Sequence, residues 1–243
     1  MSFIELTRVE KSYGKNLILD SIDLTIERGE FVTIIGPYGS GKSTILRHLA
    51  GLLTPDSGTI TINGASPSEA LKSRKIGYAF QNANILPWKT VAENITMVQD
   101  IANVSDAKKV QGLLRLGNLE EHSTHNVQQL SGGMQQILGI LRALTLEPDL
   151  LILDEPFASI DEVSREKFQK TLKNIHSKTK KTTLMVTHSI QEAVYLSDRI
   201  VVLTKKPAKV NHVVTIKLAE REDMYSKNFN ARVKQLRMAL ADD

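Results

Sequence analysis

The sequence predicts an α/β protein with an antiparallel β subdomain near its start and a helical insertion near its middle. Alternating apolar and polar residues at the beginning are typical of half-exposed strands. Four short apolar runs further along, each of strand length, are typical of strands covered on both faces. A glycine-rich segment between the first of these runs and a helical stretch completes a strand, loop and helix unit.

The elements follow in a clear order along the first 81 residues. Alternation over residues 3–9 and 22–26 predicts two antiparallel strands. The run FVTII at 31–35 predicts a buried strand, and TILRHLAGL at 44–52 predicts a helix that ends near Gly51. TITINGA at 59–65 predicts a second hairpin, and residues 76–79 predict a short strand that leads to Gln81.

The pattern becomes helical between residues 82 and 147, where apolar residues recur every three or four positions. This predicts a helical subdomain inserted into a core made of residues 1–81 and 148–243. Apolar runs resume in the later core, and helical segments separate them, so parallel pairing is expected. These runs are residues 150–153, 182–186 and 199–203, and a final amphipathic helix is predicted from Met224 to Leu240.

Composition limits the possible functions. A chain of 243 residues with 41% hydrophobic content can form a substantial core. Its formal charge of +4 comes from scattered basic residues, and the short run at Lys178, Lys180 and Lys181 reads as a solvated face, not a nucleic-acid footprint. There is no cysteine, which excludes disulfides and thiolate metal sites. We see neither a secretory signal nor an apolar run of roughly eighteen residues, so a membrane role requires a partner.

The segment GPYGSGKS, Gly36 to Ser43, fits the phosphate-loop pattern G-x-x-x-x-G-K-[ST]. Glycines in such a loop leave backbone N–H groups free to surround phosphate oxygens. Lys42 is expected at the β- and γ-phosphates, Ser43 at magnesium and Thr44 at the α-phosphate. A glycine-rich turn that merely caps a helix is the alternative. The predicted nucleotide contacts here are Gly36, Pro37, Tyr38, Gly39, Ser40, Gly41, Lys42, Ser43 and Thr44.

Two adjacent acids follow a buried strand in LLILDEP, residues 150–156. Asp154 is placed to organise magnesium through its water, and Glu155 is the candidate general base for an attacking water. The same pair of acids is also common at the entry to a helix. The phosphate loop earlier in the chain favours the catalytic interpretation.

LSGGM, residues 130–134, combines a hydroxyl, two glycines and the start of a helix, as an anion-receiving helix N-terminus does. With these motifs in this order, the chain resembles the ATP-binding cassette (ABC) family over nearly its whole length. The resemblance implies a P-loop core of ABC ATPase type. It also implies that Ser131, Gly132 and Gly133 bind the γ-phosphate held by the opposite subunit, so that two chains must pair, as a homodimer or with a similar ATPase chain.

The resemblance assigns further roles one residue at a time. Tyr13 matches the aromatic that stacks on adenine, Gln81 the glutamine that senses magnesium and the attacking water, and Asp161 the aspartate that links the two active sites. His188 matches the switch histidine at the γ-phosphate. Without the resemblance, Tyr13 would be interpreted as an exposed strand tyrosine and His188 as a structural histidine. LSGGM matches the signature of the family. Tyr38 stands where a small residue is usual, and Ile137 replaces the arginine that commonly follows the signature glutamine, here Gln136. Ala158 and Ile160 replace a glycine and a leucine.

The implied activity is ATP hydrolysis with Mg²⁺, in which Glu155, His188, Gln81 and Lys42 act. The later segments resemble the importer branch that serves nitrate, sulfonate, taurine and pyrimidine- or thiamine-precursor uptake. Transmembrane permease subunits and, indirectly, an extracytoplasmic binding protein are the implied partners, which would place the chain on the cytoplasmic face of the membrane. Alternatives are a soluble ABC ATPase acting on nucleic acid or ribosomes, and a nucleotide-controlled binding module. His122 and His125 read as surface residues.

Overall fold

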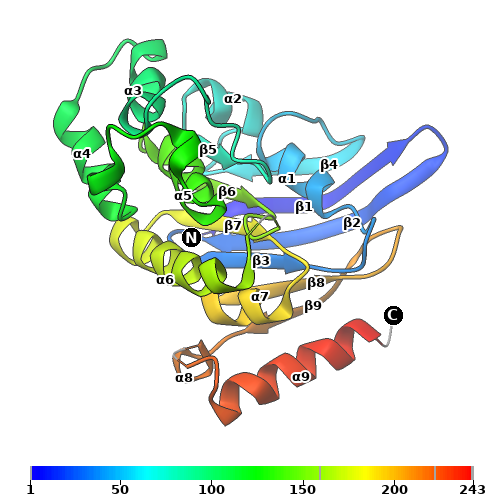
Figure 1. Cartoon of the computed structure of the whole chain (residues 1–243). Coiled ribbons are helices and arrows are strands. Elements are labelled where there is room, and N and C mark those ends of the chain that lie inside the picture. Colours follow the sequence, from blue (N-terminus) through cyan, green and yellow to red (C-terminus); the bar gives the residue numbers. More distant parts are fainter. Residues whose placement is uncertain (1, 159, 222, 242–243) are drawn as a thin grey trace. The chain divides into compact units, whose positions relative to one another are not determined.

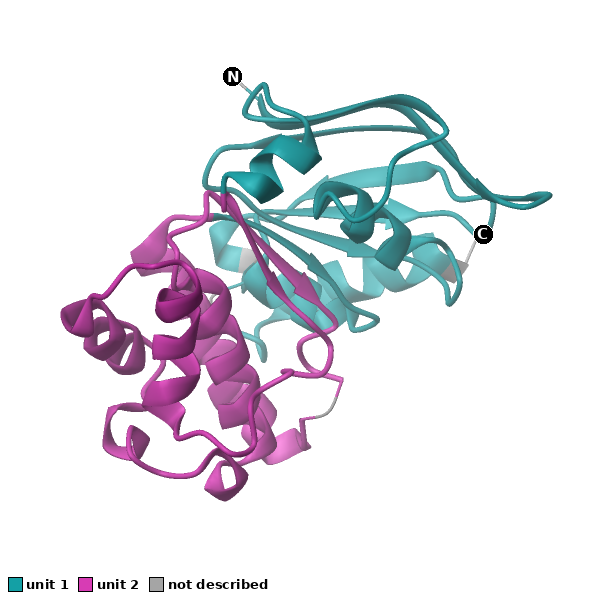
Figure 2. Ribbon diagram, turned by 90° about the horizontal axis from the view of Figure 1, so that it is seen from above, with its two compact units in different colours: residues 1–73, 182–243 teal, residues 74–181 magenta. Residues whose placement is uncertain are grey.

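The computed structural model of the chain describes residues 2–158, 160–221 and 223–241. The chain divides into two compact units, drawn in different colours in Figure 2. The first unit combines Met1–Ser73 with Thr182–Asp243, and the second is Arg74–Lys181. The predicted helical segment 82–147 lies within the second unit. The division of the chain into a nucleotide-binding core and a helical subdomain at residues 81 and 148 stays a prediction.

An antiparallel sheet in the first unit has the strand order β2-β1-β4. Its strands are β1 (Ser2–Tyr13), β2 (Asn16–Glu27) and β4 (Ser57–Ile62). Leu6 lies opposite Leu24 on one side and Ile60 on the other, and all three side chains are buried. The alternation near the N-terminus therefore predicted these strands correctly, because one face of the sheet packs inward.

The second hairpin expected around residues 59–65 does not form. β4 pairs with β1, and after a turn closed by a bridge between Ile62 and Ala65 the chain enters α2 (Pro67–Lys72). Ser66 caps this helix through a reciprocal pair of hydrogen bonds with Glu69, and Pro67 occupies its first turn. These helix-start signals leave no residues for a returning strand.

Four strands of the first unit follow the order β7-β3-β8-β9. They are β3 (Phe31–Ile35), β7 (Thr182–Val186), β8 (Arg199–Leu203) and β9 (Val210–Thr215). β3 runs parallel to β7 and β8, as predicted, whereas β9 is antiparallel to β8. Every residue of β3 is buried, which explains its continuous apolar run.

The helices of the first unit pack against its strands or against one another. They are α1 (Lys42–Leu49), α2, α7 (Ile190–Leu196), α8 (Leu218–Arg221) and α9 (Lys227–Ala241). The predicted final helix is confirmed as α9, red in Figure 1, which packs against α7 and α8. Phe229, Val233 and Leu236 supply its buried stripe at the three and four spacing of an amphipathic helix.

The second unit joins two parallel strands to a group of helices. The strands are β5 (Ile76–Ala79) and β6 (Leu150–Asp154), and the helices are α3 (Val91–Ile101), α4 (Ala107–Leu116), α5 (Gly132–Leu144) and α6 (Glu162–Thr179), with short 3₁₀ segments at Glu120–His122 and Val127–Gln129. α5 packs against α3, α6 and β5. The helical texture expected over 82–147 is confirmed.

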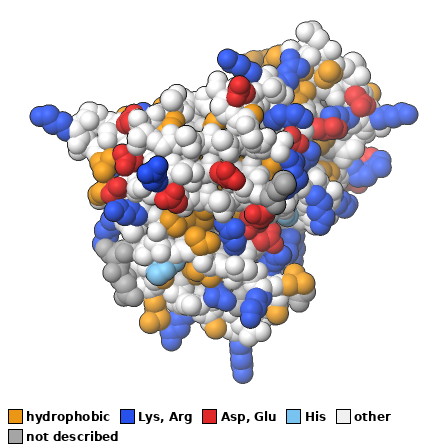
Figure 3. All heavy atoms as spheres, turned by 180° about the vertical axis from the view of Figure 1, so that it is seen from behind, with side chains coloured by type: hydrophobic (Ala, Val, Ile, Leu, Met, Phe, Trp, Pro, Cys, Tyr) orange, Lys and Arg blue, Asp and Glu red, His pale blue; other side chains and the backbone are white. Residues whose placement is uncertain are grey.

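Charged side chains of both signs are interspersed on the face drawn in Figure 3. In the portion of the chain that the structure describes, none of the helices combines the length and apolarity needed to span a membrane.

Candidate nucleotide-binding site

The phosphate loop connects the buried strand β3 to α1, the context that the motif requires. Gly39 and Gly41 have φ angles of 76° and 82°, in the region that favours glycine. A Cβ added to Gly41 would lie 2.8 Å from Leu19 Cδ2 and 3.0 Å from Ile18 Cγ2. The loop backbone therefore passes close to β2, and a side chain at residue 41 would push it away.

Lys42 is buried within this loop, and its ammonium group donates hydrogen bonds to the Gly36 and Pro37 carbonyls, both at 2.9 Å. Gly41 precedes α1 and supplies no side chain to cap it, and the first turn holds no acidic residue. The positive end of the helix dipole thus faces the loop. The buried Ser40 hydroxyl has no hydrogen-bond partner among the described residues. A buried cation, an uncapped helix start and an unsatisfied hydroxyl suit a phosphate chain.

His188 lies on the short segment between β7 and α7, and the structure brings its ring to the phosphate loop. The ring centroids of Tyr38 and His188 are 6.3 Å apart, with 25° between the ring planes. This is a stacked geometry within the usual range for aromatic pairs. The Thr187 hydroxyl donates to the buried Glu192 carboxylate and also accepts from the Ser189 N–H, so the segment that carries His188 is held from both sides.

Tyr13 is the last residue of β1 and lies opposite Asn16 at the tip of the β1–β2 hairpin. The turn is made by Gly14, whose φ is 60°, and by Lys15. Tyr13 is 45% exposed, so its ring is accessible for stacking.

In the second unit, Asp154 ends β6 and accepts a hydrogen bond of 2.8 Å from the Tyr78 hydroxyl. Tyr78 lies on the neighbouring strand β5, opposite Ile152. Sequence reasoning missed Tyr78; its only signal is a polar group on an otherwise apolar strand. The phenol orients the carboxylate, so a metal or water at Asp154 would meet a fixed oxygen.

Glu155 follows with a φ of 45°, a conformation that is strained for a residue with a side chain. Such strain is often found at functional positions. The Ala158 N–H donates to the Glu155 carbonyl at 3.1 Å, so a tight turn holds this backbone in place. The Glu155 side chain is half-buried beside the end of β6.

Gln81 is exposed, and its main-chain carbonyl accepts a hydrogen bond of 2.7 Å from the Gln136 amide. Gln136 lies on α5 and is buried. This contact ties the segment that carries Gln81 to the helix that begins at the signature motif. The positioning role of Gln136 could not be seen in the sequence, because 55 residues separate the partners.

Ser131 caps α5 by accepting from the Met134 N–H at 3.4 Å, while Ser131 and Gly132 are exposed. The buried Gly133 faces Ser164 of α6: a Cβ at Gly133 would lie 3.6 Å from the Ser164 Cβ. A cavity of about 570 Å³ adjoins this helix start, with Ser131, Gly133, Met134 and Ile137 in its wall. Ile137 is only 4% exposed, so the position that departs from the family's arginine is apolar and turned inward.

Asp161 is exposed and caps α6 by accepting from the Ser164 N–H at 2.9 Å. The hydroxyl of Ser164, followed by its N–H, holds the pKa of Asp161 below its usual value of 3.8. The carboxylate is therefore ionised at neutral pH. Of the neighbouring departures, Ile160 is buried and Ala158 exposed. His122 and His125, away from this loop, have their Nδ1 atoms 3.0 Å apart.

The first unit thus places Tyr38 of the phosphate loop beside His188, with Tyr13 on a hairpin that contacts the loop through β2. The second unit carries Gln81, Asp154, Glu155, the Ser131 helix start and Asp161. A phosphate loop between a buried strand and an uncapped helix, with a buried lysine, defines a P-loop nucleotide-binding protein of the α/β class.

Comparison with known proteins specifies the family. The model of the ABC transporter family matches residues 19–158, and the chain belongs to that family. It is accordingly an ATP-binding and ATP-hydrolysing cassette. A solved dimeric ATP-binding cassette in a post-hydrolysis state, bound to ADP and Pi, is 32% identical, has a TM-score of 0.73, and is covered over 99% of its length by 88% of this chain.

Curated relatives extend over most of the chain. An uncharacterized ABC transporter ATP-binding protein of Methanocaldococcus jannaschii is 36% identical over 98% of this chain and 90% of its own length. The aliphatic sulfonates import ATP-binding protein of Bacillus subtilis is 38% identical over 89% of this chain and 84% of its own length. A probable sulfate/thiosulfate import ATP-binding protein of Chlorella vulgaris is 41% identical over 82% of this chain and 86% of its own length.

Proposed function

We propose that this chain hydrolyses ATP to energise an ABC importer. The observation that carries the proposal is the 38% identity, over 89% of the chain, to a protein named for aliphatic sulfonate import. Several other relatives share that name. Within the cargo group of nitrate, sulfonate, taurine and pyrimidine or thiamine precursors, these relatives favour a sulfonate. The cargo itself would be selected by permease subunits and an extracytoplasmic binding protein.

The residues of the first unit are proposed to hold the nucleotide. Lys42 neutralises charge on the β- and γ-phosphates, and Thr44 contacts the α-phosphate. The backbone of residues 36–43 donates N–H groups to phosphate oxygens. Tyr13 stacks on adenine, and His188 contacts the γ-phosphate. The buried ammonium of Lys42 and the stack of Tyr38 on His188 support these roles.

Residues of the second unit are proposed to act in hydrolysis and in pairing. Glu155 accepts the proton of the attacking water, and Gln81 orients that water. Ser131, Gly132 and Gly133 receive the γ-phosphate bound by a partner subunit, and Asp161 links the two sites of the pair. The exposed, capped start of α5 supports the signature role.

Mg²⁺ would be held by Ser43, Gln81 and Asp154, and when bound it supplies charge neutralisation at the terminal phosphates. The hydroxyl and carboxylate oxygens of Ser43 and Asp154 are the hard ligands that magnesium prefers. Tyr78 keeps the Asp154 carboxylate in one orientation through its 2.8 Å hydrogen bond. Through its permease partners the chain would sit on the inner face of the membrane.

The catalytic assignment is tested with Glu155→Gln, which keeps the size of the side chain but removes the base. We expect MgATP binding to persist, ATP turnover to fall about 10²- to 10⁴-fold, and an ATP-dependent dimer to accumulate. Phosphate release and sedimentation velocity measure these effects. Glu121→Gln, which alters a carboxylate exposed on a 3₁₀ segment of the same unit, is the control. Near-normal phosphate release by Glu155→Gln would remove Glu155 as the base.

The importer assignment is tested in membranes from the native cell. The tagged chain should co-purify with hydrophobic permease subunits. Deletion of the gene that encodes the chain should abolish uptake of a radiolabelled alkanesulfonate. Complementation by the wild type, but not by Glu155→Gln, should restore uptake. Co-purification with ribosomes or nucleic acid instead of membrane proteins would contradict the proposal.

A further inference from the structure

We propose that Asp56 is a positioning residue for nucleotide binding: its carboxylate holds the end of β1 that carries Tyr13 in a fixed relation to the phosphate-loop helix α1. The inference rests on the proposed function, because it takes Tyr13 as the platform for adenine. Asp56 itself touches no nucleotide in this proposal; it acts through the backbone of Ser12.

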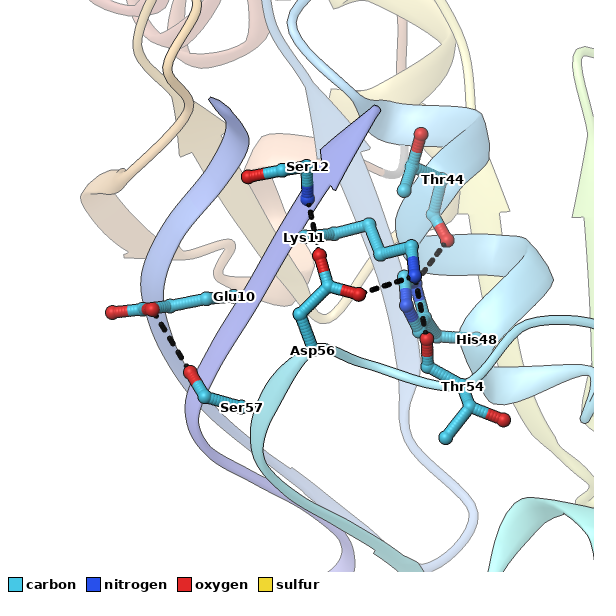
Figure 4. Close-up of polar contacts among 8 residues, drawn as sticks. All are labelled: Glu10, Lys11, Ser12, Thr44, His48, Thr54, Asp56 and Ser57. Atoms are coloured by element: carbon cyan, nitrogen blue, oxygen red, sulfur yellow. Dashed lines mark hydrogen bonds and ion pairs between the residues drawn. The ribbon is translucent and has the colours of Figure 1, made fainter. Parts of the chain in front are cut away.

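Asp56 makes three contacts with the last residues of β1 (Figure 4). Its Oδ2 accepts from the Ser12 N–H at 2.7 Å, and its Oδ1 accepts from the Lys11 ammonium at 2.7 Å. Its own N–H donates to the Glu10 carbonyl at 2.9 Å. Lys11 also donates to the Thr54 carbonyl at 2.9 Å, so the ammonium bridges two points of the same loop.

This end of β1 needs such support because its pairing with β4 stops before Tyr13. The β1–β4 register runs to Glu10 opposite Ser57, whereas Lys11, Ser12 and Tyr13 pair with β2 on their other side. The register with β2 also shifts between residues 9 and 12. Where a strand is paired on one side only, a hydrogen bond from a main-chain N–H to a charged acceptor is stronger than one to a neutral acceptor. Asp56 therefore continues the support of β1 where β4 ends.

The loop that carries Asp56 is anchored to α1. The Gly51 N–H donates to the His48 carbonyl at 3.0 Å, and the Leu52 N–H donates to the Arg47 carbonyl at 2.9 Å. The His48 ring is buried, with its Nδ1 2.7 Å from the Thr44 carbonyl at the other end of the helix. The loop that carries Asp56 is thus tied at its start to the helix that presents Thr44.

The opposite strand of the hairpin provides a second connection to the phosphate loop. Leu19 lies opposite Lys11, and the Leu19 side chain approaches the backbone of Gly41. A shift of the hairpin relative to α1 would therefore move Tyr13 relative to the phosphates. The contacts of Asp56 oppose that shift, because they join β1 directly to the loop after α1.

Asp56 carries a full charge at neutral pH. The hydrogen bond from Lys11, and next that from the Ser12 N–H, hold the pKa of this carboxyl below its usual value of 3.8. The Asp56 side chain is 48% exposed, so its ion pair adds little to folding stability. Loss of the carboxylate should consequently change the geometry of β1 more than the stability of the fold.

The test compares two triphosphate ligands, of which only one carries a base and a ribose. Binding of MgATP and of magnesium tripolyphosphate is measured by calorimetry for the wild type, Asp56→Ala and Asp56→Asn. Stacking of a base on an aromatic ring is worth about 1–3 kcal/mol, or roughly a 5- to 150-fold change in affinity. We expect Asp56→Ala to weaken binding of MgATP about tenfold and binding of tripolyphosphate less than twofold. The affinities of Asp56→Asn should lie between those of the wild type and Asp56→Ala.

Asp23→Ala is the matched control, because Asp23 is an exposed carboxylate that also accepts a β1 N–H, that of Arg8 at 2.9 Å, but lies away from Tyr13. It should leave both affinities unchanged. Equal weakening of both ligands by Asp56→Ala would overturn the inference, because that result marks a general disturbance of the loop.

Tyr13→Ala separates this inference from the proposed function. If Tyr13→Ala weakens MgATP selectively while Asp56→Ala does not, the positioning role of Asp56 is wrong and the role of Tyr13 stands. If Tyr13→Ala leaves the ratio of the two affinities unchanged, the adenine platform is wrong and the role of Asp56 falls with it.

Discussion

Gly41→Ala should destabilise the first unit more than Gly39→Ala, although both glycines lie in one loop with nearly equal φ angles. Both substitutions place a side chain in the left-handed region. They differ in surroundings, since a Cβ at Gly39 meets nothing within 4 Å, whereas one at Gly41 meets Leu19 Cδ2 at 2.8 Å and Ile18 Cγ2 at 3.0 Å. The pair of variants therefore isolates the cost of the close approach between the phosphate loop and β2.

The magnitudes follow from two effects. The left-handed backbone costs a non-glycine residue about 1–2 kcal/mol, which applies to both variants. Overpacking of a buried contact adds about 1–3 kcal/mol, which applies to Gly41→Ala alone because Leu19 is fully buried. We expect a loss of unfolding free energy of about 1–2 kcal/mol for Gly39→Ala and about 2–5 kcal/mol for Gly41→Ala.

Urea unfolding without nucleotide, followed by far-UV circular dichroism, measures both values. Nucleotide is left out so that ligand binding does not contribute to the measured free energy. Equal losses in the two variants would refute the reasoning, because the close approach to Leu19 and Ile18 of β2 is found at Gly41 and not at Gly39. A larger loss for Gly39→Ala would show that the loop is held from a different side.

Three further predictions concern His48, Tyr38 and Ser131. Burial lowers the pKa of His48 below its usual value of 6.5, so on acidification the unfolded chain binds a proton at this histidine at a higher pH than the folded chain does. The contribution of neutral His48 to the unfolding free energy is therefore complete above pH 6.5 and is lost as pH falls through the lowered pKa. The unfolding free energy of the wild type should therefore fall more steeply between pH 7.5 and 5.5 than that of His48→Leu, by at most about 1.4 kcal/mol per pH unit. Tyr38→Ser should lower the ATP turnover number about two- to tenfold, since an aromatic contact is worth about 0.5–1.5 kcal/mol, whereas Tyr38→Phe should retain it; equal rates in all three proteins would show that the stack on His188 has no catalytic consequence. Ser131→Arg should leave MgATP binding by a single chain intact but prevent dimer formation in the Glu155→Gln background; an ATP-dependent dimer of that double variant in sedimentation velocity would count against the signature role.

Much of the fold could be predicted because local patterns report burial directly. The run FVTII is continuous because β3 is covered on both faces, and the alternation near the N-terminus reflects a sheet with one inward face. The expected hairpin at 59–65 failed for a related reason. Asn63 and Gly64 do form a turn, but the strand before them finds its partner in β1, and a local pattern carries no information about a partner far along the chain.

The candidate site divides in the same way. Lys42, Ser43, Asp154 and Glu155 were recognisable from short motifs, because a phosphate loop and a strand-end carboxylate need those residue types at neighbouring positions. The groups that orient them were not. Tyr78 is 76 residues from Asp154, and Gln136 is 55 residues from Gln81. Tyr78 belongs to no motif, and the place of Gln136 in the signature says nothing about Gln81. Only the register of β5 on β6 and the placement of α5 reveal these two contacts.

The sequence by itself identified the phosphate loop, the acidic strand end and the serine–glycine helix start, because each consists of residues that are close along the chain. Which groups hold that chemistry in place was decided by folding: Tyr38 meets His188, and Asp56 meets Ser12, through contacts between separate elements. Hydrogen bonds and ring stacking act only over a few ångströms. Distance along the chain does not report such proximity, so these partners became visible only once strands and helices were placed.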